Sequence, residues 1–438
     1  MIFTQYRKKA ALTFVGLLIT SSASAYQIVN SGITYELSTV TGFMANKSLL
    51  ESQPWYGDGT KALSFADSAK ASGYLTTWTE FAHAYALDAS WTGGAYVDHA
   101  TANPCCSSSS VAINITSANL MDWAIVTRYI SSTDTQSSLT RLASGLRGTF
   151  NSASLISNFP NSNTYDCNLF DVKGMCISAG GRYSTVDNPS SNSSAAVVTL
   201  GYKVSPNIRI GGFLDQSVNT HSPTGIDISN KHPMMGAFAY WNQNADGLGY
   251  QVKLANAYQD KDLSTSRDVI GTSEAGRGNT SLNARSYVSE LSYAFMYKEN
   301  TLVRPYFALR HTTIEQDAYT ETGVTTPLTY SALNDRTTSA LMGVKFKHAL
   351  TPKANLIGSL GVEQDLRHKT DRLTASGVSG LTSENFSGNI HHTRPVASLG
   401  ATYDIAKTQR LTGEVLVQQL PFQSTAGATA YFNYMIGF

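Results

Sequence analysis

The stretch ATAYFNYMIGF (Ala428–Phe438) alternates between two sets of side chains. One set contains Ala430, Phe432, Tyr434, Ile436 and Phe438, and the other contains Tyr431, Asn433, Met435 and Gly437. A period of two is typical of a β-strand, whose successive side chains point to opposite faces. A soluble protein usually ends in a polar, frayed tail. We therefore expect this strand to have its backbone groups and its apolar face bound in a larger structure.

Alternating segments of about ten residues recur from about residue 174 onward, and each ends in a turn. Clear examples are AAVVTLGYKV (195–204), IRIGGFLDQS (208–217), GYQVKLANAY (249–258) and VSELSYAFMY (288–297), whereas MMGAFAYWNQ (234–243) has an ambiguous facing. The face opposite to the apolar one carries Arg182, Lys203, Arg209, Asp215, Lys253, Glu290, Arg304, Lys345, Glu363 and Glu414. A hydrated lumen is the simpler interpretation of these charges, and a substrate-selecting constriction is the alternative.

The connections between these segments fall into two kinds that alternate along the chain. The short ones are 205–207, 242–247, 298–301, 349–353 and 406–409. The longer, polar ones are 188–194, 218–233, 261–282, 316–335, 367–391 and 421–427. Short turns on one side and long loops on the other are typical of an outer-membrane barrel. Ala428–Phe438 would then close the barrel against a first strand near Met175–Asp187, with its aromatic face toward lipid.

The composition agrees with this interpretation. Charged residues make up 14% of the chain, against about 25% in typical soluble domains. The formal net charge of +1 argues against nucleic acid or an anionic surface as the main partner. Beyond residue 25, no stretch approaches the roughly 18 apolar residues of a membrane-spanning helix. A secreted all-β protein and an outer-membrane barrel remain, and the two kinds of connection favour the barrel.

Residues 1–25 have the pattern of a secretory signal peptide. Arg7, Lys8 and Lys9 precede a largely apolar core, Ala10–Thr20, which is too short to span a bilayer as a helix. Ala23-Ser24-Ala25 then provides a cleavage pattern. We expect cleavage between Ala25 and Tyr26, and we expect export.

The region before the barrel has a different character. Residues 26–132 show no sustained alternation, and in TTWTEFAHAYA (76–86) the spacing of Trp78, Phe81, Ala82 and Tyr85 is helical. Residues 133–165 are predicted to contain a linker helix that leads toward the barrel. Its apolar stripe would contain Leu139, Leu142, Leu146 and Phe150, and its other, mostly small and polar face carries Arg141 and Arg147. From charge sign alone, these two arginines are predicted to pair with Glu290, Glu363 or Glu414.

The predicted architecture is therefore an all-β transmembrane barrel of 12 antiparallel strands over residues 166–438. A partly helical N-terminal region and a linker helix precede it.

Four cysteines in an exported chain permit disulfides. Cys167 and Cys176 are predicted to form one, which in the chain-entropy model stabilises by roughly 2–3 kcal/mol. Cys105 and Cys106 are adjacent, so a vicinal disulfide, bonds to other chains and free thiols all stay open. The cysteine spacing fits no zinc motif.

No catalytic or cofactor signature is present. YGDGT (56–60) matches the first two positions of the Gly-Asp-Ser block of some esterases, but Gly59 stands where the nucleophilic serine would be. The segment is therefore interpreted as a turn made by Gly57, Asp58 and Gly59. His391 and His392 lie in a polar loop without a nearby carboxylate pair, so no metal site is predicted. No Ser/His/Asp arrangement, phosphate loop or dinucleotide fingerprint is recognisable. We expect neither an enzyme nor a bound cofactor.

Three barrel segments resemble the autotransporter family of type V secretion. CISAGGRYSTV (176–186) resembles its first barrel strand, and VRPYFALRHT (303–312) and AYFNYMIGF (430–438) resemble its later strands. ESQPWYGDGTKALSFADSAKASG (51–73) resembles the stretch before the barrel in some short autotransporter-domain proteins. The order of signal peptide, N-terminal region, linker helix and twelve-strand barrel also matches the family.

The resemblance implies an outer-membrane location in a Gram-negative bacterium, a monomeric barrel in lipid, a pore that contains the linker helix of 133–165, and translocation or display of the chain's own passenger. It also implies that the assembly machinery and periplasmic chaperones handle the chain, reading Phe432, Tyr434, Ile436 and Phe438 as an assembly signal. Autotransporter passengers are usually long β-helical rods, whereas residues 26–132 form a short region without repeats. The alternative is therefore an outer-membrane pore or surface adhesin with a retained N-terminal region.

Overall fold

The computed structural model describes residues 26–73, 79–86, 96–102, 109–162, 165–422 and 426–438. The chain divides into two compact units, Met1–Tyr129 and Ile130–Phe438, and each is described by itself. None of the helices in these ranges is both long and apolar enough to cross a membrane.

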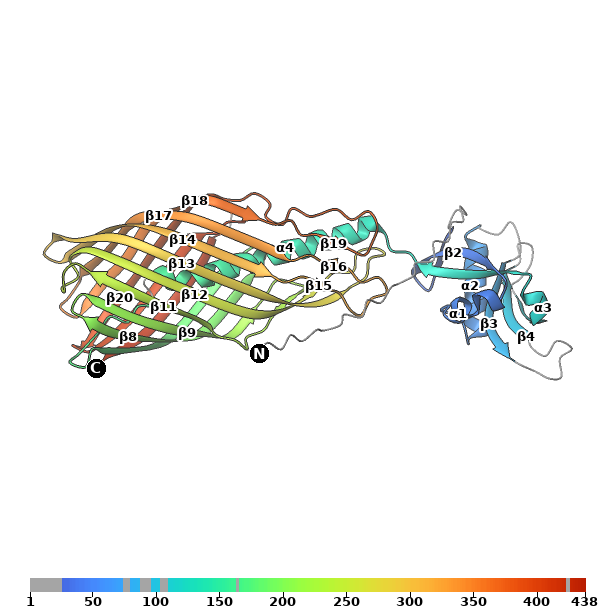
Figure 1. Ribbon diagram of the computed structural model, residues 1–438, viewed down its shortest axis with the longest axis horizontal. Helices are drawn as coiled ribbons and strands as arrows, with labels where there is room; N and C mark the ends of the chain where they lie inside the picture. The colour runs from blue at the N-terminus through green and yellow to red at the C-terminus, as the bar shows by residue number, and fades with distance from the viewer. Residues whose placement is uncertain (1–25, 74–78, 87–95, 103–108, 163–164, 423–425) are drawn as a thin grey trace, which may run out of the picture. The chain divides into compact units, whose positions relative to one another are not determined.

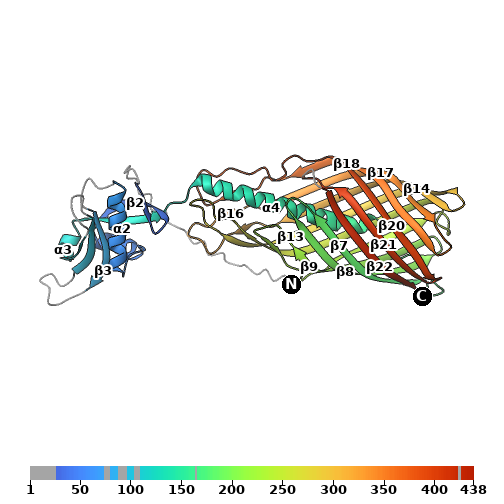
Figure 2. The same ribbon diagram turned by 180° about the vertical axis from the view of Figure 1, so that it is seen from behind.

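The second unit is a barrel of antiparallel strands (Figures 1 and 2). Its strands are β7 (Met175–Val186), β8 (Ser191–Ser205), β9 (Ile208–His221), β11 (Met234–Asn242), β12 (Gly249–Ser266), β13 (Arg277–Lys298), β14 (Thr301–Gln316), β17 (Leu333–Ala349), β18 (Ala354–Thr370), β20 (Thr393–Ala406), β21 (Gln409–Gln419) and β22 (Ala426–Gly437). β22 pairs with β7, with Tyr431 opposite Arg182. Closure leaves no open sheet edge in hydrocarbon. The predicted twelve-strand barrel and its closing strand are confirmed.

The alternation of side chains follows the wall of the barrel. Phe432 is exposed on the outer face of β22, whereas its neighbours Tyr431 and Asn433 are buried on the inner face. The ambiguous segment 234–243 is resolved in the same way, because Tyr240 faces inward and Trp241 faces outward. Apolar side chains therefore meet lipid, and polar ones line the lumen.

The five short turns lie where they were predicted, but the long connections differ from the prediction. The first is short, because β8 begins at Ser191 and leaves only 187–190 between the strands. β12 and β13 extend into the predicted 261–282 loop, which shrinks to 267–276. Three short strands, β15 (Tyr319–Thr320), β16 (Thr329–Tyr330) and β19 (Ala375–Ser376), form a separate sheet, and β10 (Ile226–Ile228) pairs with β12. Polar residues had been assigned to loops, but outside hydrocarbon a strand can be polar on both faces.

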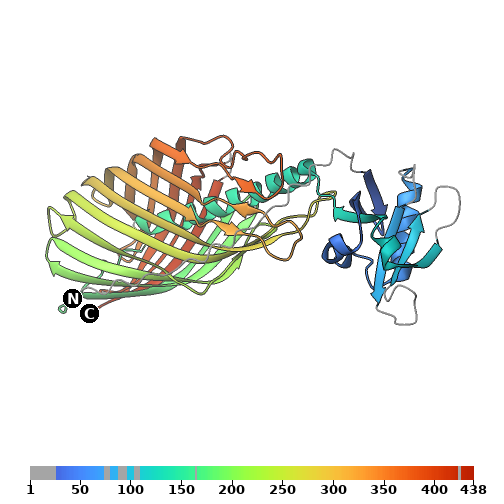
Figure 3. The ribbon, with the colours of Figure 1, turned by 45° about the vertical axis from the view of Figure 1, so that its right-hand side comes forward.

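Helix α4 (Ser132–Asn158) occupies the lumen (Figure 3). Ser131 is its N-cap and accepts a hydrogen bond from the Asp134 amide. The predicted stripe of Leu139, Leu142, Leu146 and Phe150 is buried, as predicted. Apart from Arg141 and Arg147, the opposite face is mostly glycine, alanine, serine and threonine, and it is buried as well over the last turns. Small side chains on that face let the wall approach the helix axis closely. The helix continues into the 3-10 turn η2 (Phe159–Ser162).

The first unit is a six-stranded sheet in the order β1-β2-β6-β3-β4-β5. Its strands are β1 (Tyr26–Asn30), β2 (Ile33–Thr41), β3 (Thr79–Ala86), β4 (Tyr96–Ala102), β5 (Ser109–Asn114) and β6 (Asp122–Arg128), and its helical segments are η1 (Met44–Asn46), α1 (Lys47–Glu51), α2 (Gly59–Ala71) and α3 (Ile115–Ala118). Trp55, Phe65 and Phe81 meet in its core.

The predicted helix over 76–86 is wrong, because 79–86 forms strand β3. The register against β4 shifts between Ala82 and Ala84. Phe81 and Ala82 are adjacent and both buried, which interrupts the period of two. Two adjacent buried residues produce the i, i+3, i+4 spacing of apolar residues that is typical of a helix. Trp78 lies outside the described residues.

The predicted turn at Gly57, Asp58 and Gly59 is only partly right. Gly57 adopts the left-handed conformation (φ 87°) that favours glycine. Asp58, however, is the N-cap of α2 and accepts a hydrogen bond from the Lys61 amide at 3.0 Å. Gly59 is already the first helical residue. Asp58 therefore has a structural role at a helix start.

Candidate functional site: the helix-filled lumen

The N-terminal part of α4 contacts the long connections of the barrel. Asp134 Oδ2 accepts a hydrogen bond from the Thr272 amide at 2.8 Å. Gln136 donates to Thr382 O at 3.1 Å. The apolar stripe packs in one cluster with side chains from the long connections, among them Leu328, Tyr330, Leu373, Phe386 and Phe422. This end of the helix is therefore enclosed by polar and apolar contacts together.

The two arginines of α4 bind partners outside the predicted set. Arg141 is 65% exposed and lies 3.6 Å from Asp268. Arg147 Nε donates to Phe386 O at 2.7 Å. Both partners belong to long connections, because both arginines lie on the part of α4 that these connections surround.

Two of the three predicted acidic partners, Glu290 and Glu363, bind cations of the barrel wall instead. Glu290 receives two hydrogen bonds from Lys345 Nζ, at 2.6 and 2.8 Å. Glu363 binds Arg310 and, at 2.9 Å, Arg394. The predicted pairing of the helix arginines with Glu290 or Glu363 is therefore wrong.

The middle of the lumen is closed by the last turns of α4. Asn158 Oδ1 accepts hydrogen bonds from Ser286 Oγ at 2.8 Å and from Thr312 Oγ1 at 3.0 Å. One cavity between helix and wall at this level has a volume of about 10 Å³, close to the roughly 10–15 Å³ that a single water needs. All residues of α4 from Gly148 to Asn158 are buried. The last turns of the helix therefore fill the lumen at this level.

After α4, the chain continues toward the short turns and binds the barrel wall through buried charged side chains. Tyr165 donates to Asp215 Oδ2 at 2.5 Å, and Arg182 binds the same carboxylate at 2.7 and 3.0 Å. The Arg182 and Asp215 side chains are 0% and 1% exposed. Arg209 binds Asp166 at 2.7 and 3.1 Å. The inward facing of these wall charges was predicted, but their pairing was not.

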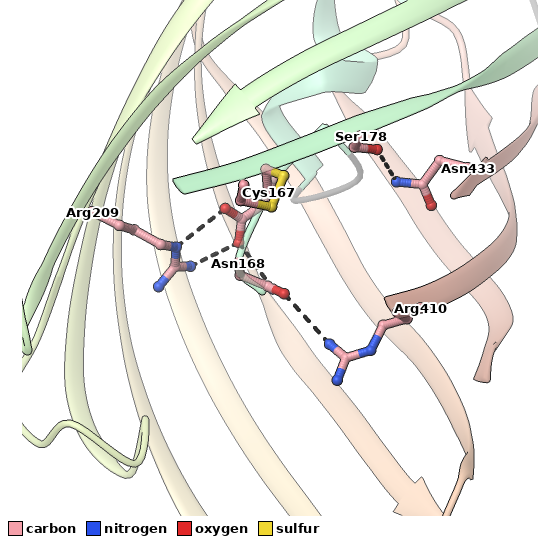
Figure 4. Close-up of a disulfide and its surroundings, with 8 residues drawn as sticks. Cys167, Asn168, Ser178, Arg209, Arg410 and Asn433 are labelled. Carbon is pink, nitrogen blue, oxygen red and sulfur yellow. Dashed lines mark hydrogen bonds and ion pairs between the residues drawn. A yellow bond between two sulfur atoms is a disulfide. The ribbon is translucent and has the colours of Figure 1, made fainter. Parts of the chain in front are cut away.

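A disulfide joins Cys167 to Cys176, the second residue of β7, with 5.8 Å between the Cα atoms. Figure 4 shows the bond beside the side chains of Arg209 and Arg410. Arg410 donates to Asn168 Oδ1 at 3.4 Å. The segment that leaves the helix is thus fastened to β7, β9 and β21.

Phe438 completes this rim through its backbone. Its amide donates to Met175 O at 2.8 Å, and its carbonyl accepts from the Met175 amide at 3.2 Å and from the Asp171 amide at 3.3 Å. Of the predicted assembly signal, Phe432 and Phe438 are exposed on the outer face, and Tyr434 and Ile436 are half-buried there.

Between the end of α4 and the short turns, the lumen widens into a cavity of about 490 Å³. Its charged lining residues are Arg209, Arg304, Lys345, Lys347, Arg410, Asp166, Asp246 and Glu414. The barrel thus has a polar vestibule on the side of the short turns. The helix separates this vestibule from the side of the long connections.

A buried ion pair supports the small external sheet. Arg267 binds both carboxylate oxygens of Glu321, at 2.5 and 2.8 Å, and Tyr330 donates to the same carboxylate at 2.9 Å. Burial raises the pKa of the Tyr330 hydroxyl well above its usual range. Tyr330 therefore stays a neutral donor at physiological pH. No spacing in the sequence indicates this cluster, since its members come from separate loops.

The surroundings of His392 differ from the prediction. Its Nδ1 lies 3.3 Å from Asp365 Oδ2, and His368 Nδ1 lies 2.9 Å from the same oxygen. Residues three apart in a strand normally face opposite sides. Here the register of β17 against β18 shifts between Thr338 and Ser339, so that Leu366 bulges outward and both Asp365 and His368 face the lumen. No local spacing in the sequence signals such a bulge.

Two sets of predicted residues lie outside the described ranges. These are Ala25, on one side of the predicted cleavage site, and the pair Cys105 and Cys106. Tyr26, on the other side of that site, is the first residue of β1.

The fold and its interior define a transmembrane β-barrel with a helix of the same chain in its lumen. The family model described as the autotransporter beta-domain matches residues 177–415, more than half of the chain. The chain belongs to the autotransporter β-domain family. It is accordingly an outer-membrane β-barrel of a Gram-negative bacterium.

The chain is similar over a limited stretch to the NalP proteins of two Neisseria meningitidis serogroup B strains. The Neisserial autotransporter lipoprotein NalP of Neisseria meningitidis serogroup B is 35% identical over 95 residues. This stretch is 21% of the chain and 9% of NalP. The similarity therefore spans less than a tenth of that relative's length.

Solved structures of autotransporter domains are also similar. The translocator domain of NalP from Neisseria meningitidis has 20% identity and a TM-score of 0.49, covering 63% of this chain and 92% of that one. The beta domain of the Bordetella autotransporter Brka has 12% identity and a TM-score of 0.42, covering 61% and 100%. The transport unit of AIDA-I from Escherichia coli has 11% identity and a TM-score of 0.41, covering 71% and 100%.

Proposed function

We propose that the barrel translocates its own N-terminal region, residues 26–132, and displays it at the cell surface. In this proposal, α4 remains in the lumen as the linker and closes the pore afterwards. Residues 1–25 act as the export signal and are removed between Ala25 and Tyr26. The function is one of transport and display, without catalysis or a cofactor.

The observation that carries the proposal is the direction of the chain through the lumen. Disulfide-bonded Cys167 lies on the side of the short turns, which face the periplasm in outer-membrane barrels. Ser131 contacts Thr272 in a long connection at 2.9 Å, and long connections face outward. The 27 residues of α4 run between these two ends. At about 1.5 Å per residue the helix is about 40 Å long, enough for a hydrocarbon core of about 30 Å.

Protease treatment of intact cells tests the display. We expect residues 26–129 to be degraded from outside while a fragment that begins near residue 130 stays in the membrane. A periplasmic marker protein must survive in the same cells, and permeabilised cells provide the positive control. Protection of 26–129 in intact cells, with degradation after permeabilisation, would overturn display and favour a retained N-terminal region.

Conductance in planar bilayers tests the closure of the pore. The full chain is expected to conduct little, because the last turns of α4 are buried in the lumen on all sides. Deletion of 132–158 is expected to open a large conductance. Deletion of 26–129 is the matched control and should leave the pore closed, since it removes chain outside the barrel unit. Large conductance in the full chain would contradict the role of α4 as a plug.

We also propose that Phe432, Tyr434, Ile436 and Phe438 are read by the assembly machinery and its periplasmic chaperones. These side chains lie on the outer face of β22, where a folding partner reaches them before lipid does. A monomeric barrel suffices for this role, since closure by β22 and β7 leaves no strand edge for a second copy.

A further inference from the structure

Three side chains with metal-ligating atoms converge where β18 and β20 meet the long connections. Asp365 and His368 belong to β18, and His392 directly precedes β20. Asp365 Oδ2 lies 2.9 Å from His368 Nδ1 and 3.3 Å from His392 Nδ1. All three ligand atoms lie within 4.8 Å of one another. Metal bonds of about 2.0–2.1 Å at tetrahedral angles separate neighbouring ligand atoms by about 3.4 Å. The two separations from Asp365 Oδ2 are thus within about half an ångström of that spacing.

The second nitrogen of His368 is already oriented as in a metal site. His368 Nε2 lies 2.7 Å from Asp335 Oδ1, and Asp335 also accepts from Thr370 Oγ1 at 2.6 Å. Histidine ligands of metals almost always donate their other N–H to a carboxylate, a carbonyl or water. This contact fixes the ring orientation and directs Nδ1 toward Asp365.

The fixed charges around the cluster leave room for a cation. Three buried carboxylates, those of Asp335, Glu363 and Asp365, face two guanidinium groups. Arg310 binds Glu363. Arg394 binds Glu363 at 2.9 Å and both oxygens of Asp365, Oδ1 at 2.7 Å and Oδ2 at 2.9 Å. Without His368, the group carries one excess negative charge. A divalent ion beside Asp365 would change this net charge from −1 to +1.

The three candidate ligands differ in their access to solvent. The His368 and Asp365 side chains are 0% and 1% exposed, whereas that of His392 is 55% exposed. Two ligands are therefore held rigidly by the wall, and the third closes over an ion that enters from outside. An exposed third ligand also leaves a coordination position for water.

We propose that Asp365, His368 and His392 bind a divalent transition-metal ion of the Zn²⁺ class. Two imidazoles and one carboxylate are ligands that suit Zn²⁺ better than Mg²⁺ or Ca²⁺. The ion replaces the proton between His368 Nδ1 and Asp365 Oδ2, and that proton leaves to solvent. Bound there, the ion joins β18 to the connection that precedes β20. The His368 ring also lies 5.7 Å from that of Phe422, which packs on the α4 stripe, so the ion would stiffen the outer enclosure of the helix.

Titration of the full-length chain with ZnCl₂ in detergent tests the site. The chain is purified without a polyhistidine tag, and Cys105 and Cys106 are changed to serine in every variant so that thiols do not compete. Isothermal titration calorimetry is expected to give one ion per chain. The same ion should raise the temperature at which the folded band is lost on gels, and EDTA should reverse this rise.

Two variants of neighbouring residues separate the site from incidental histidine binding. His392→Ala is expected to weaken Zn²⁺ binding by at least about tenfold and to abolish the thermal shift. His391→Ala should behave as the parent, because the side chain of His391 is outside the cluster and only its carbonyl contacts Arg394, at 2.6 Å. In the parent, Co²⁺ should give the absorption spectrum of a tetrahedral site. Absence of binding to the parent, or equal effects of the two variants, would overturn the proposal.

Discussion

Arg182 illustrates how a single charge is accommodated inside the barrel. Its guanidinium and the Asp215 carboxylate are almost fully buried and bind through two hydrogen bonds. Removing one partner of such a pair leaves an uncompensated buried charge. The period of two in the sequence predicted that both residues face inward. It did not predict their pairing, because β7 and β9 are separated by β8 and the contact depends on the register of both neighbours.

We predict that Arg182→Gln lowers the free energy of unfolding by about 3 kcal/mol or more, because Asp215 stays buried without its cation. Urea unfolding in lipid vesicles, followed by tryptophan fluorescence, measures this loss. Arg336→Gln is the matched control. Arg336 is also an arginine of the barrel wall, but it is 58% exposed and 3.1 Å from Glu315, so its loss should cost less than about 1 kcal/mol. Equal losses in both variants would contradict the buried pair.

Among the elements, α4 followed its sequence pattern and β3 did not. The stripe of α4 was predicted because four apolar residues repeat at helical spacing over several turns. In 76–86 the same kind of spacing arose from two adjacent buried residues, Phe81 and Ala82, beside a register shift. A long periodic segment averages over such local irregularities, whereas one of 11 residues does not. The external strands β15, β16 and β19 were missed for another reason, since each has only two residues and shows no period.

The small face of α4 leads to a second prediction. A Cβ atom at Gly148 would overlap the ring of Pro189 in the connection between β7 and β8. We expect Gly148→Val to displace the helix from the wall and to raise the conductance of the full chain in planar bilayers. Ser137→Val introduces the same β-branched side chain at an exposed position of α4. This control should conduct as little as the parent, and a parent-like Gly148→Val would show that the helix does not need this close approach.

For the whole molecule, closure is the decisive event. β22 and β7 are more than two hundred positions apart in the sequence, and eleven residues of β22 pair with β7. All the remaining pairs of adjacent barrel strands follow one another in the chain, with only the short strands β10, β15, β16 and β19 lying between some of them in sequence. The last pairing therefore has the largest loop to close. Features of β22 that guide assembly act on this step.

We predict that Phe438→Ala lowers the amount of folded barrel in the outer membrane several-fold, because it removes part of the proposed assembly signal. The measurement is the heat-modifiable band in outer-membrane fractions. Ile405→Ala is the control, since Ile405 is an exposed apolar residue of β20 near the same rim. A general need for apolar surface would reduce both variants alike, and that result would contradict a specific signal at Phe438.

Alternation and the two kinds of connection were sufficient to predict a closed twelve-strand barrel, and the resemblance to autotransporters implied a helix within it. The reason is that hydrocarbon tolerates no unpaired backbone group, so an alternating chain of this length has only one way to satisfy them all. The contacts inside the lumen were beyond the reach of such patterns. Arg141 and Arg147 reach loop residues instead of wall carboxylates, and a bulge at Leu366 turns Asp365 and His368 to the same side. Such contacts depend on strand register and loop course, which three-dimensional packing sets and no local period encodes.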